Sequence, residues 1–327
     1  MMYFRERDGL ETQLNQWGKR RCPFFFIFDF EVNNCYCTPL DHLDNDIFFD
    51  LDGFSHLISD FSIKVLPPHF EKKAVSLAQY QKAFQRVITE IKQGNTYLLN
   101  LTCPTELDIQ VSLLEIFISS QAKFKLYFKD QFVTFSPERF IRIQQNLIKT
   151  YPMKGTLDAS LLHARERILA DEKEKAEHTL VVDLLRNDLS MVAKHITVNR
   201  FRYIHKIRAG MKELLQVSSE ISGLLEERWT ERIGSILLTL LPAGSISGAP
   251  KKKTLEIIKA VEGYERGFFT GVFGYFDGHQ LDSAVMIRFI EKQGTRLVYK
   301  SGGGITIDSR LEDEYQEMLD KVYLPCC

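Results

Sequence analysis

Two pairs of glutamates stand three residues apart in segments with helical patterning. Glu174 and Glu177 lie in "EKAEH", and Glu314 and Glu317 lie in "EYQEM". Residues three apart project from one face of a helix, so each pair would place two carboxylates side by side. Four carboxylates facing one cleft would repel one another without a cation, and Mg²⁺ prefers oxygen ligands of this kind. The pairs are therefore candidate magnesium ligands, although one such pair alone is usually an exposed helix face.

Three glycine-bearing segments could bring backbone N–H groups close to an anionic ligand. They are "KGT" (154–156), in which Lys154 precedes the glycine, "PAGSISGAPK" (242–251) and "SGGGI" (301–305). A helix expected to start near Pro250 would add its positive end. The second segment is not the G-x-x-x-x-G-K-[ST] loop, so nucleotide binding is not expected there. A lysine in a loop is usually only a solvated charge, and Lys154 needs further support before a role is assigned.

A cation in an apolar strand also points to a ligand or an acid. Arg288 stands in "SAVMIRFI", which predicts a buried strand. An unpaired guanidinium would be costly there, so it should face a carboxylate of the protein or of a ligand. Tyr275 in "VFGYFD" and Lys321 in "MLDKV" could add a hydroxyl donor and a second cation. The structural alternative for each charge is a salt bridge.

The composition is that of an ordinary globular protein. The chain has 327 residues, 44% of them hydrophobic, and a net charge of −1. This balance gives no basis for a nucleic-acid surface or an anionic-membrane patch. No apolar run approaches the roughly 20 residues of a membrane span, and the N-terminal segment does not resemble a signal peptide. We therefore expect a cytoplasmic protein, with free thiols at Cys22, Cys35, Cys37, Cys103, Cys326 and Cys327.

The hydrophobic periodicity predicts an α+β fold, because strands occur in antiparallel runs with helices inserted in blocks. Aromatic-rich runs in residues 1–72 predict paired strands, and a helix is expected from an N-cap at Ser76 to Gly94. Further helices are expected near 112–121, 159–178, 180–192, 229–241, 250–263 and from about 311. "SAVMIRFIEKQ" is expected to be the middle strand of a three-stranded meander. We expect a single two-lobed domain, 1–327, with a strand region (1–72) and a core (73–327).

Eight segments, taken in order, resemble the chorismate-utilising enzymes. They are "SPERF", "YPMKGT", "AEHTLVVDLLRNDL", "PAGSISGAPK", "GVFGY", "MIRF", "SGGGI" and "EYQEMLDK". The family includes anthranilate, aminodeoxychorismate, isochorismate and salicylate synthases, and the resemblance covers roughly residues 75–325. It implies a two-lobed β/α/α/β sandwich with the active site between its two halves.

The resemblance also implies a role for each candidate residue. Mg²⁺ would be held by Glu177 and Glu317, with Glu174 and Glu314 nearby, and would meet the ring carboxylate of chorismate. Four residues would surround that same end of the substrate: Gly155, Thr156, Ser245 and Lys321. Four others match the grip on the enolpyruvyl carboxylate: Arg288, Tyr275, Gly303 and Gly304.

Two positions distinguish between members of this family. Leu98 stands where the water-adding members carry a lysine base, and leucine cannot activate water. Lys154 stands where anthranilate synthases carry alanine, which is similar to the aminodeoxychorismate synthases. In those enzymes the lysine attacks C2 of the ring as the C4 hydroxyl leaves, and ammonia then attacks C4 and expels the lysine. The resemblance assigns Glu138 as the acid that protonates the hydroxyl and places His205 near it. Lys154 would have to react as a neutral amine, so we expect its environment to lower its pKa from about 10.4.

The implied product is 4-amino-4-deoxychorismate, a precursor of p-aminobenzoate and folate. No G-x-C-x-G nucleophile elbow of a glutaminase occurs in the sequence. Ammonia would therefore come from solution or from a separate glutamine amidotransferase subunit. Two alternatives stay open: an anthranilate synthase component I, and a catalytically inactive homologue that keeps the fold.

Overall fold

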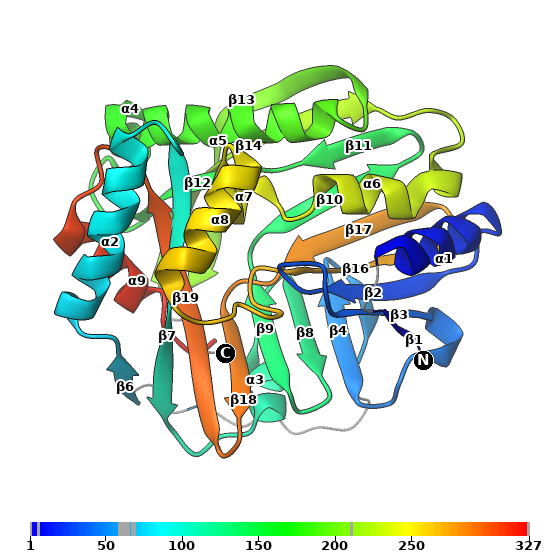
Figure 1. The fold of residues 1–327 in the computed structure, drawn as a ribbon, viewed down its shortest axis with the longest axis horizontal. Coiled ribbons are helices and arrows are strands. Elements are labelled where there is room, and N and C mark those ends of the chain that lie inside the picture. The colour runs from blue at the N-terminus through cyan, green and yellow to red at the C-terminus, as the bar shows by residue number, and fades with distance from the viewer. Residues whose placement is uncertain (1, 5–6, 58–65, 67–69, 210–211, 326–327) are drawn as a thin grey trace. The chain divides into compact units, whose positions relative to one another are not determined.

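The computed structural model describes residues 2–4, 7–57, 66, 70–209 and 212–325 (Figure 1). Its chain forms two compact units, each assembled from three separate segments. Unit 1 comprises Met1–Asp44, Glu138–Ser245 and Gly271–Val285, and unit 2 comprises Asn45–Pro137, Ile246–Thr270 and Met286–Cys327. Each unit contains one antiparallel sheet with helices, so the predicted α+β class is confirmed. The expectation of a single domain stays a prediction.

Unit 1 is built on a sheet that has ten strands among the described residues, in the order β1-β3-β2-β16-β17-β10-β11-β14-β12, with β13 also paired to β14. The strands are β1 (Met2–Phe4), β2 (Phe24–Phe28), β3 (Cys35–Pro39), β10 (Arg139–Gln144), β11 (Leu147–Thr150), β12 (Met153–Asp158), β13 (Lys194–Ala209), β14 (Lys212–Leu224), β16 (Val272–Phe276) and β17 (Gln280–Val285). The helices are α1 (Arg7–Lys19), α4 (Ala164–Ala170), α5 (Glu172–Ser190) and α6 (Ile233–Leu240). α5 runs alongside β12, β13 and β14 (Figure 1).

Unit 2 is built on a sheet of nine strands in the described part of the chain, in the order β15-β7-β19-β18-β9-β8-β4-β5, with β6 also paired to β7. The strands are β4 (Ile47–Leu51), β5 (Phe54–His56), β6 (Glu71–Ala74), β7 (Leu98–Asp108), β8 (Phe124–Phe128), β9 (Phe132–Ser136), β15 (Gly248–Ala249), β18 (Phe289–Gln293) and β19 (Arg296–Ile305). The helices are α2 (Leu77–Lys92), α3 (Leu113–Ser119), α8 (Lys251–Glu262) and α9 (Leu311–Asp320). The short helix α7 (Gly244–Ser247) contains the point where the chain passes from unit 1 to unit 2.

Aromatic side chains make up much of the core of unit 1. The rings of Phe24, Phe26 and Phe28 on β2 lie one beside the next, with centroids 6.1 and 4.9 Å apart. Trp17 of α1 packs on Phe24 at 5.5 Å, and Trp229 meets the edge of Phe276 at 5.9 Å. The predicted strand pairing in residues 1–72 is confirmed for the described part of that region, where β2 pairs with β3 and β4 pairs with β5.

The first two helices differ in whether the sequence predicted them. α2 has the predicted N-cap at Ser76, which exchanges hydrogen bonds with Gln79 in a capping box, and Gly94 follows its end at φ 76°. In contrast, α1 was not predicted. Leu10, Leu14 and Trp17 are buried on one face of α1, a spacing of four and three that is typical of an amphipathic helix.

The predicted meander is wrong. "SAVMIRFI" does not form one strand, because β17 ends at Val285 and β18 begins at Phe289, and the two strands belong to different sheets. Arg288 lies in the break, with φ 55°. The end of β17 and the start of β18 are both buried, so the sequence shows one continuous apolar run although the backbone turns from one sheet to the other. The apolar residues of "RFIRIQQNLIKTYP" also predict one strand, and this prediction is wrong because the segment forms the hairpin β10–β11.

The four described thiols agree with the sequence-based prediction. Cys22, Cys35, Cys37 and Cys103 are free, and burial raises the pKa of Cys103 to about 12. Cys326 and Cys327 lie outside the described residues. Among the described helices, none is both long and apolar enough to cross a membrane.

Candidate active site

In unit 1, Lys154 pairs with one of the predicted magnesium ligands. Its Nζ lies 2.7 Å from Oε2 of Glu177, and the two side chains are 23% and 11% exposed. β12 supplies the lysine and α5 the glutamate, and α5 packs directly on β12. Lys173, one turn earlier on α5, lies 3.9 Å from the other carboxylate oxygen of Glu177. Lys154 is therefore a half-buried ion-pair partner and not a solvated loop charge.

Gly155 lets a second glutamate approach the same strand. A Cβ on Gly155 would lie 3.0 Å from Oε2 of Glu174, and the backbone has φ 90°, where residues with a side chain are strained. Glu174 and Glu177 thus approach adjacent residues of β12 from one face of α5, as their spacing predicted. Thr156, the next residue, is exposed.

Glu138 and Ser245 meet at a small cavity in unit 1. Ser245 Oγ lies 2.5 Å from Glu138 Oε1, and both residues line the cavity with Tyr151 and the buried Asp188. The sequence placed Ser245 at the metal end of the site. Its contact in this structure is with the residue predicted to be the general acid.

Tyr275 and His205 lie on separate strands of the same sheet. Tyr275 on β16 is buried, and burial together with the charge of Asp282 raises its pKa to about 12, so its hydroxyl keeps its proton. Arg139 pairs with Asp282 at 2.8 Å. His205 on β13 lies opposite Gln216 on β14 in the strand register.

In unit 2, four predicted site residues gather at one place. Lys321 Nζ lies 2.7 Å from Glu317 Oε1 and donates a hydrogen bond to the carbonyl of Gly302 at 2.8 Å. A Cβ on Gly303 would lie 3.5 Å from Glu314 Oε2 and 3.6 Å from both Glu317 Oε1 and Lys321 Nζ. Since α9 packs on β19, the glycine of the strand faces both carboxylates of the helix.

Leu98 and Arg288 complete the predicted set in unit 2. Leu98 is buried, and its Cδ1 would lie 3.0 Å from a Cβ on Gly304, so the strand is apolar at this point. Arg288 Nε donates to the hydroxyl of Tyr323 at 3.1 Å, and the guanidinium lies 5.5 Å from the centre of that ring. Tyr323 is a contact that the sequence prediction missed.

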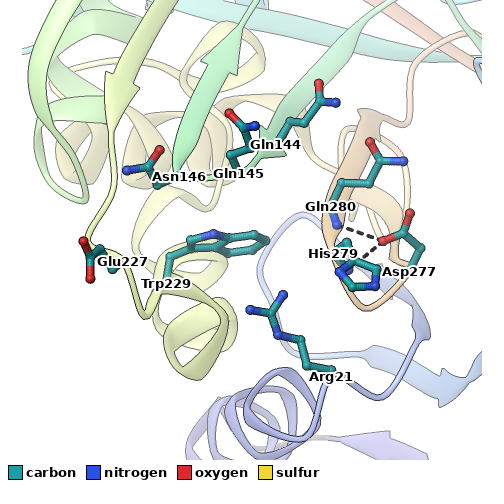
Figure 2. Close-up of a pocket in the computed structure, with 9 residues that line it drawn as sticks. All are labelled: Arg21, Gln144, Gln145, Asn146, Glu227, Trp229, Asp277, His279 and Gln280. Carbon is teal, nitrogen blue, oxygen red and sulfur yellow. Dashed lines mark hydrogen bonds between the residues drawn. The ribbon is translucent and has the colours of Figure 1, made fainter.

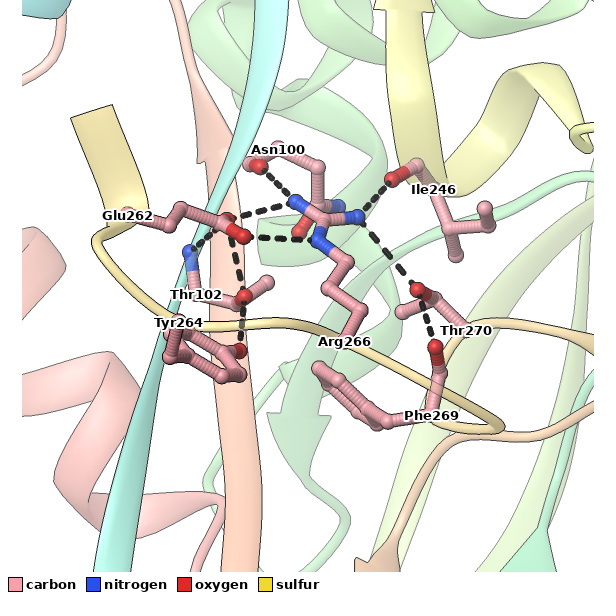
Figure 3. Close-up of polar contacts among 8 residues, drawn as sticks. All are labelled: Asn100, Thr102, Ile246, Glu262, Tyr264, Arg266, Phe269 and Thr270. Carbon is pink, nitrogen blue, oxygen red and sulfur yellow. Dashed lines mark hydrogen bonds and ion pairs between the residues drawn. The ribbon is translucent and has the colours of Figure 1, made fainter. Parts of the chain in front are cut away.

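A buried ion pair supports the strands and the turn next to these residues (Figure 3). Glu262 and Arg266 are 1% and 2% exposed, with 2.6 Å between Oε1 and Nη2. Arg266 donates to the carbonyls of Asn100 on β7 and Ile246 on α7, and Glu262 accepts from the backbone and hydroxyl of Thr102. The pair therefore links α8, β7 and α7 through backbone groups that would otherwise lack these bonds.

The donor chemistry of the two glutamate pairs fits Mg²⁺. Within the described ranges, no group of three or more histidine, cysteine, aspartate or glutamate side chains is arranged to hold a metal. Each glutamate pair supplies two carboxylates, and Mg²⁺ commonly uses one or two carboxylates together with substrate oxygens and water. The space that Gly303 leaves beside Glu314 and Glu317 is consistent with such a ligand.

Two residues that the sequence analysis missed hold the Lys154 strand. Gln216 Nε2 donates to the carbonyl of Gly155 at 3.0 Å. His178 Nε2 lies 2.7 Å from Ser219 Oγ, and the backbone N–H of Ser219 donates to the carbonyl of Pro152. A partial signal was the presence of Gln216, Ser218 and Ser219 in a segment expected to be a strand, because buried polar groups are usually hydrogen-bonded, but these residue types do not identify the partner.

A surface groove of about 600 Å³ in unit 1 lies apart from all these residues. Figure 2 shows its polar lining, in which Asp277 accepts from the backbone of His279 and Gln280. None of the sequence-predicted site residues lines this groove, which is formed by Arg21, Gln144, Gln145, Asn146, Glu227, Trp229, Asp277, His279 and Gln280.

Comparison with known proteins identifies the family. The family model described as chorismate binding enzyme matches residues 57–325, so the chain belongs to the chorismate binding enzymes. An "uncharacterized PabA-like protein" of Haemophilus influenzae is 51% identical over 314 residues, which cover 96% of this chain and 95% of that protein. The menaquinone-specific isochorismate synthase of Escherichia coli has the same fold, with a TM-score of 0.74, 18% identity and coverage of 98% of this chain and 82% of that chain.

More distant relatives with named activities divide between two reactions. Anthranilate synthase component 1 of Archaeoglobus fulgidus is 30% identical over 259 residues, covering 76% of this chain and 62% of that protein. Aminodeoxychorismate synthase component 1 of Bacillus subtilis is 29% identical over 259 residues, covering 75% of this chain and 54% of that protein. Overall identity therefore does not separate the two activities, and the choice has to be argued from individual residues.

Proposed function

We propose that this protein aminates chorismate to 4-amino-4-deoxychorismate, with ammonia supplied by a separate glutaminase subunit. The observation that carries the proposal is Lys154 itself. The lysine is half-buried and lies on a strand that two glutamates approach, where an anthranilate synthase is expected to carry alanine. The ion pair with Glu177 places the amine of Lys154 directly beside a proposed magnesium ligand.

The proposed reaction proceeds by two displacements on the ring. The neutral Nζ of Lys154 attacks C2, the double bond shifts, and the C4–O bond breaks as Glu138 gives its proton to the departing hydroxyl. Ammonia then attacks C4, the double bond shifts back, and the C2–N bond to Lys154 breaks. Two allylic displacements leave the stereochemistry at C4 retained. Ser245 supports Glu138, since its hydroxyl donates to Glu138 Oε1 at 2.5 Å and would orient the carboxyl and stabilise the carboxylate that remains after proton transfer.

Magnesium is part of the proposal. Glu177 and Glu317 would hold it, with Glu174 and Glu314 beside them. When bound, Mg²⁺ would neutralise the ring carboxylate of chorismate and compete with the Lys154 ammonium for Glu177, which favours the neutral amine. Arg288 and Tyr275 would bind the enolpyruvyl carboxylate through their guanidinium and hydroxyl donors. Lys321, with the backbone at Gly155 and Thr156, would contact the ring carboxylate, and Gly303 and Gly304 the enolpyruvyl group. His205 would lie near the departing hydroxyl.

An anthranilate synthase activity is the second candidate, because the relatives at about 30% identity include enzymes of both kinds. Lys154 argues against it. Leu98 argues against hydration of the ring, since its side chain cannot act as a base. A catalytically inactive homologue would have no need to keep Lys154, Glu138 and both glutamate pairs together.

One assay distinguishes chorismate amination, anthranilate synthase activity and a catalytically inactive homologue. Purified protein is incubated with chorismate and ammonium at mildly alkaline pH, with and without Mg²⁺, and the products are resolved by chromatography and mass spectrometry. We expect magnesium-dependent formation of 4-amino-4-deoxychorismate, which an added lyase converts to p-aminobenzoate. Anthranilate as the product would overturn the proposal in favour of the second candidate. Unchanged chorismate, both with ammonium and with a glutaminase partner plus glutamine, would indicate the inactive homologue.

A further inference from the structure

Lys154 and Gly155 occupy an irregularity in the pairing of β12 with β14. Met153 pairs with Ser218 and Thr156 pairs with Gln216, so two residues of β12 lie opposite the single residue Val217. A two-against-one arrangement is a β-bulge, which bends a strand and changes the direction of the side chains in it. The bulge therefore sets where the side chain of Lys154 points.

The side chain of Gln216 hydrogen-bonds to the extra residue of this bulge. Its Nε2 donates to the carbonyl of Gly155 at 3.0 Å and lies 3.4 Å from the carbonyl of Val217. Gln216 is 7% exposed, so its amide is shielded from solvent and hydrogen-bonds to the protein. In regular pairing a backbone N–H would satisfy a strand carbonyl, whereas here a side-chain amide does so.

The remaining contacts of the bulge leave little freedom for Lys154. Gly155 has φ 90°, and a Cβ on Gly155 would lie 3.0 Å from Glu174 Oε2, which is a tight contact. On the side before the bulge, the backbone N–H of Ser219 holds the carbonyl of Pro152. The resulting geometry places Lys154 Nζ 2.7 Å from Glu177. From the opposite strand, the side chain of Gln216 hydrogen-bonds to the backbone of the bulge.

We propose that Gln216 is a positioning residue for Lys154: its amide fixes the bulge at Lys154–Gly155 and thereby directs the lysine onto Glu177. The importance of this for turnover rests on the proposed function, since there Lys154 is the nucleophile. The geometric part stands independently of the reaction. Gln216→Met removes the amide and keeps most of the side-chain length, so it separates hydrogen bonding from packing.

The test measures the reactivity of Lys154 without using chorismate. The folded protein is treated with an amine-acylating reagent over a range of pH, and modification of Lys154 is followed by peptide mass spectrometry. Lys149, which pairs with Glu220 at 2.8 Å in the same sheet, is the internal reference. In Gln216→Met we expect the ratio of Lys154 to Lys149 modification to rise about threefold or more at neutral pH, because a lysine that the bulge no longer directs onto Glu177 is more accessible to the reagent than one that is 23% exposed.

Two controls keep the result specific. Gln144→Met changes an exposed glutamine of β10 in the same sheet, and it should leave the ratio unchanged. If Gln216→Met fails to fold, Gln216→Asn keeps the amide but is one methylene too short, and it should give the same rise. An unchanged ratio in a folded Gln216 variant would overturn the proposal.

Turnover supplies a second readout that distinguishes this proposal from the proposed function. If the protein aminates chorismate, the Gln216 variants should lose kcat by about tenfold or more while KM for chorismate changes less than threefold, because an orienting contact affects the chemical step. If the assay yields a different product, the acylation result still decides whether Gln216 positions Lys154. A loss of turnover with unaltered acylation would assign Gln216 a role other than the one proposed.

Discussion

Lysines make corresponding contacts in the two units. Lys154 lies 2.7 Å from Glu177, and Lys321 lies 2.7 Å from Glu317, in each case the second glutamate of a pair three residues apart. An opposite charge at this distance favours the ammonium form of a lysine. For Lys321, a fixed cation suits the expected role of binding a carboxylate. For Lys154, the ion pair must be weakened before the amine can act as a nucleophile.

Replacing Lys154 with alanine tests its role at the scale of one residue. If Lys154 is the nucleophile, Lys154→Ala should lower ammonia-dependent turnover by at least about 100-fold, the scale of losing a positioned catalytic group. Chorismate binding, measured by calorimetry, should persist. Lys173→Ala is the matched control, because Lys173 also approaches Glu177 but from the exposed side of α5. Similar turnover in both variants would remove the lysine from the mechanism.

Sequence patterns could identify residues that act through their own side-chain chemistry. The glutamate pairs, Lys154 and Arg288 carry charges whose placement is unusual, and the structure brings Glu314, Glu317, Lys321 and Gly303 together. Gln216 could not be found in this way. The Gln216 side chain contacts a backbone carbonyl. The bulge depends on pairing with a distant strand, and no residue type in the sequence predicts it.

At the scale of elements, two local signals at helix starts gave correct predictions, whereas α1 was missed and α5 runs unbroken through the boundary expected between residues 178 and 180. The capping box of α2 and the start of α9 are local, and both were predicted. The separation of β17 from β18 was not, because the change of sheet depends on which distant strands pair: β17 joins β10 and β16, whereas β18 joins β9 and β19. A continuous apolar run contains no information on that choice.

The Glu262–Arg266 pair gives a prediction at this scale, because it connects α8, β7 and α7 (Figure 3). Arg266→Met leaves a buried carboxylate without its cation and removes the donors to Ile246 and Asn100. We expect the free energy of unfolding, measured with urea, to fall by roughly 3–5 kcal/mol. Arg296→Met removes an ion pair with Glu106 whose arginine is 68% exposed, and it should lower the free energy of unfolding much less, because solvent screens an exposed pair. Equal costs would show that burial does not make the Glu262 pair special.

At the scale of the whole molecule, the two units are interleaved along the chain. Each unit takes three segments, and β10 in the middle of the sequence pairs with β17 near the end. Strand pairing over such long separations is not visible in the local composition. Accordingly, no linker-like segment marks a boundary between the two units in the sequence. The α+β class depends on short-range hydrophobic patterning, so it could be predicted from the sequence. The assignment of strands to two sheets depends on long-range pairing, so it could not be predicted from the sequence.

Stability of the molecule should depend on pH through His178, which is buried between α5 and β14. Burial, reinforced by the positive charge of Arg202, lowers the pKa of His178 to about 4, whereas the unfolded value is about 6.5. Below pH 6.5 the unfolded chain therefore binds a proton that the folded chain does not. The contribution of neutral His178 is present in full above that pH and is lost progressively as the pH falls toward 4, at up to about 1.4 kcal/mol per pH unit.

A comparison of wild type with His178→Gln isolates this term. Glutamine can still hydrogen-bond to Ser219 but does not titrate, so the variant should be less stable than wild type at pH 7.5, and the difference should narrow as the pH falls from 6.5 to 4.5. Urea midpoints at each pH give the difference directly, since the other groups titrate in both proteins. A constant gap for His178→Gln would mean that His178 takes up its proton equally well in the folded and unfolded protein, contrary to the burial argument.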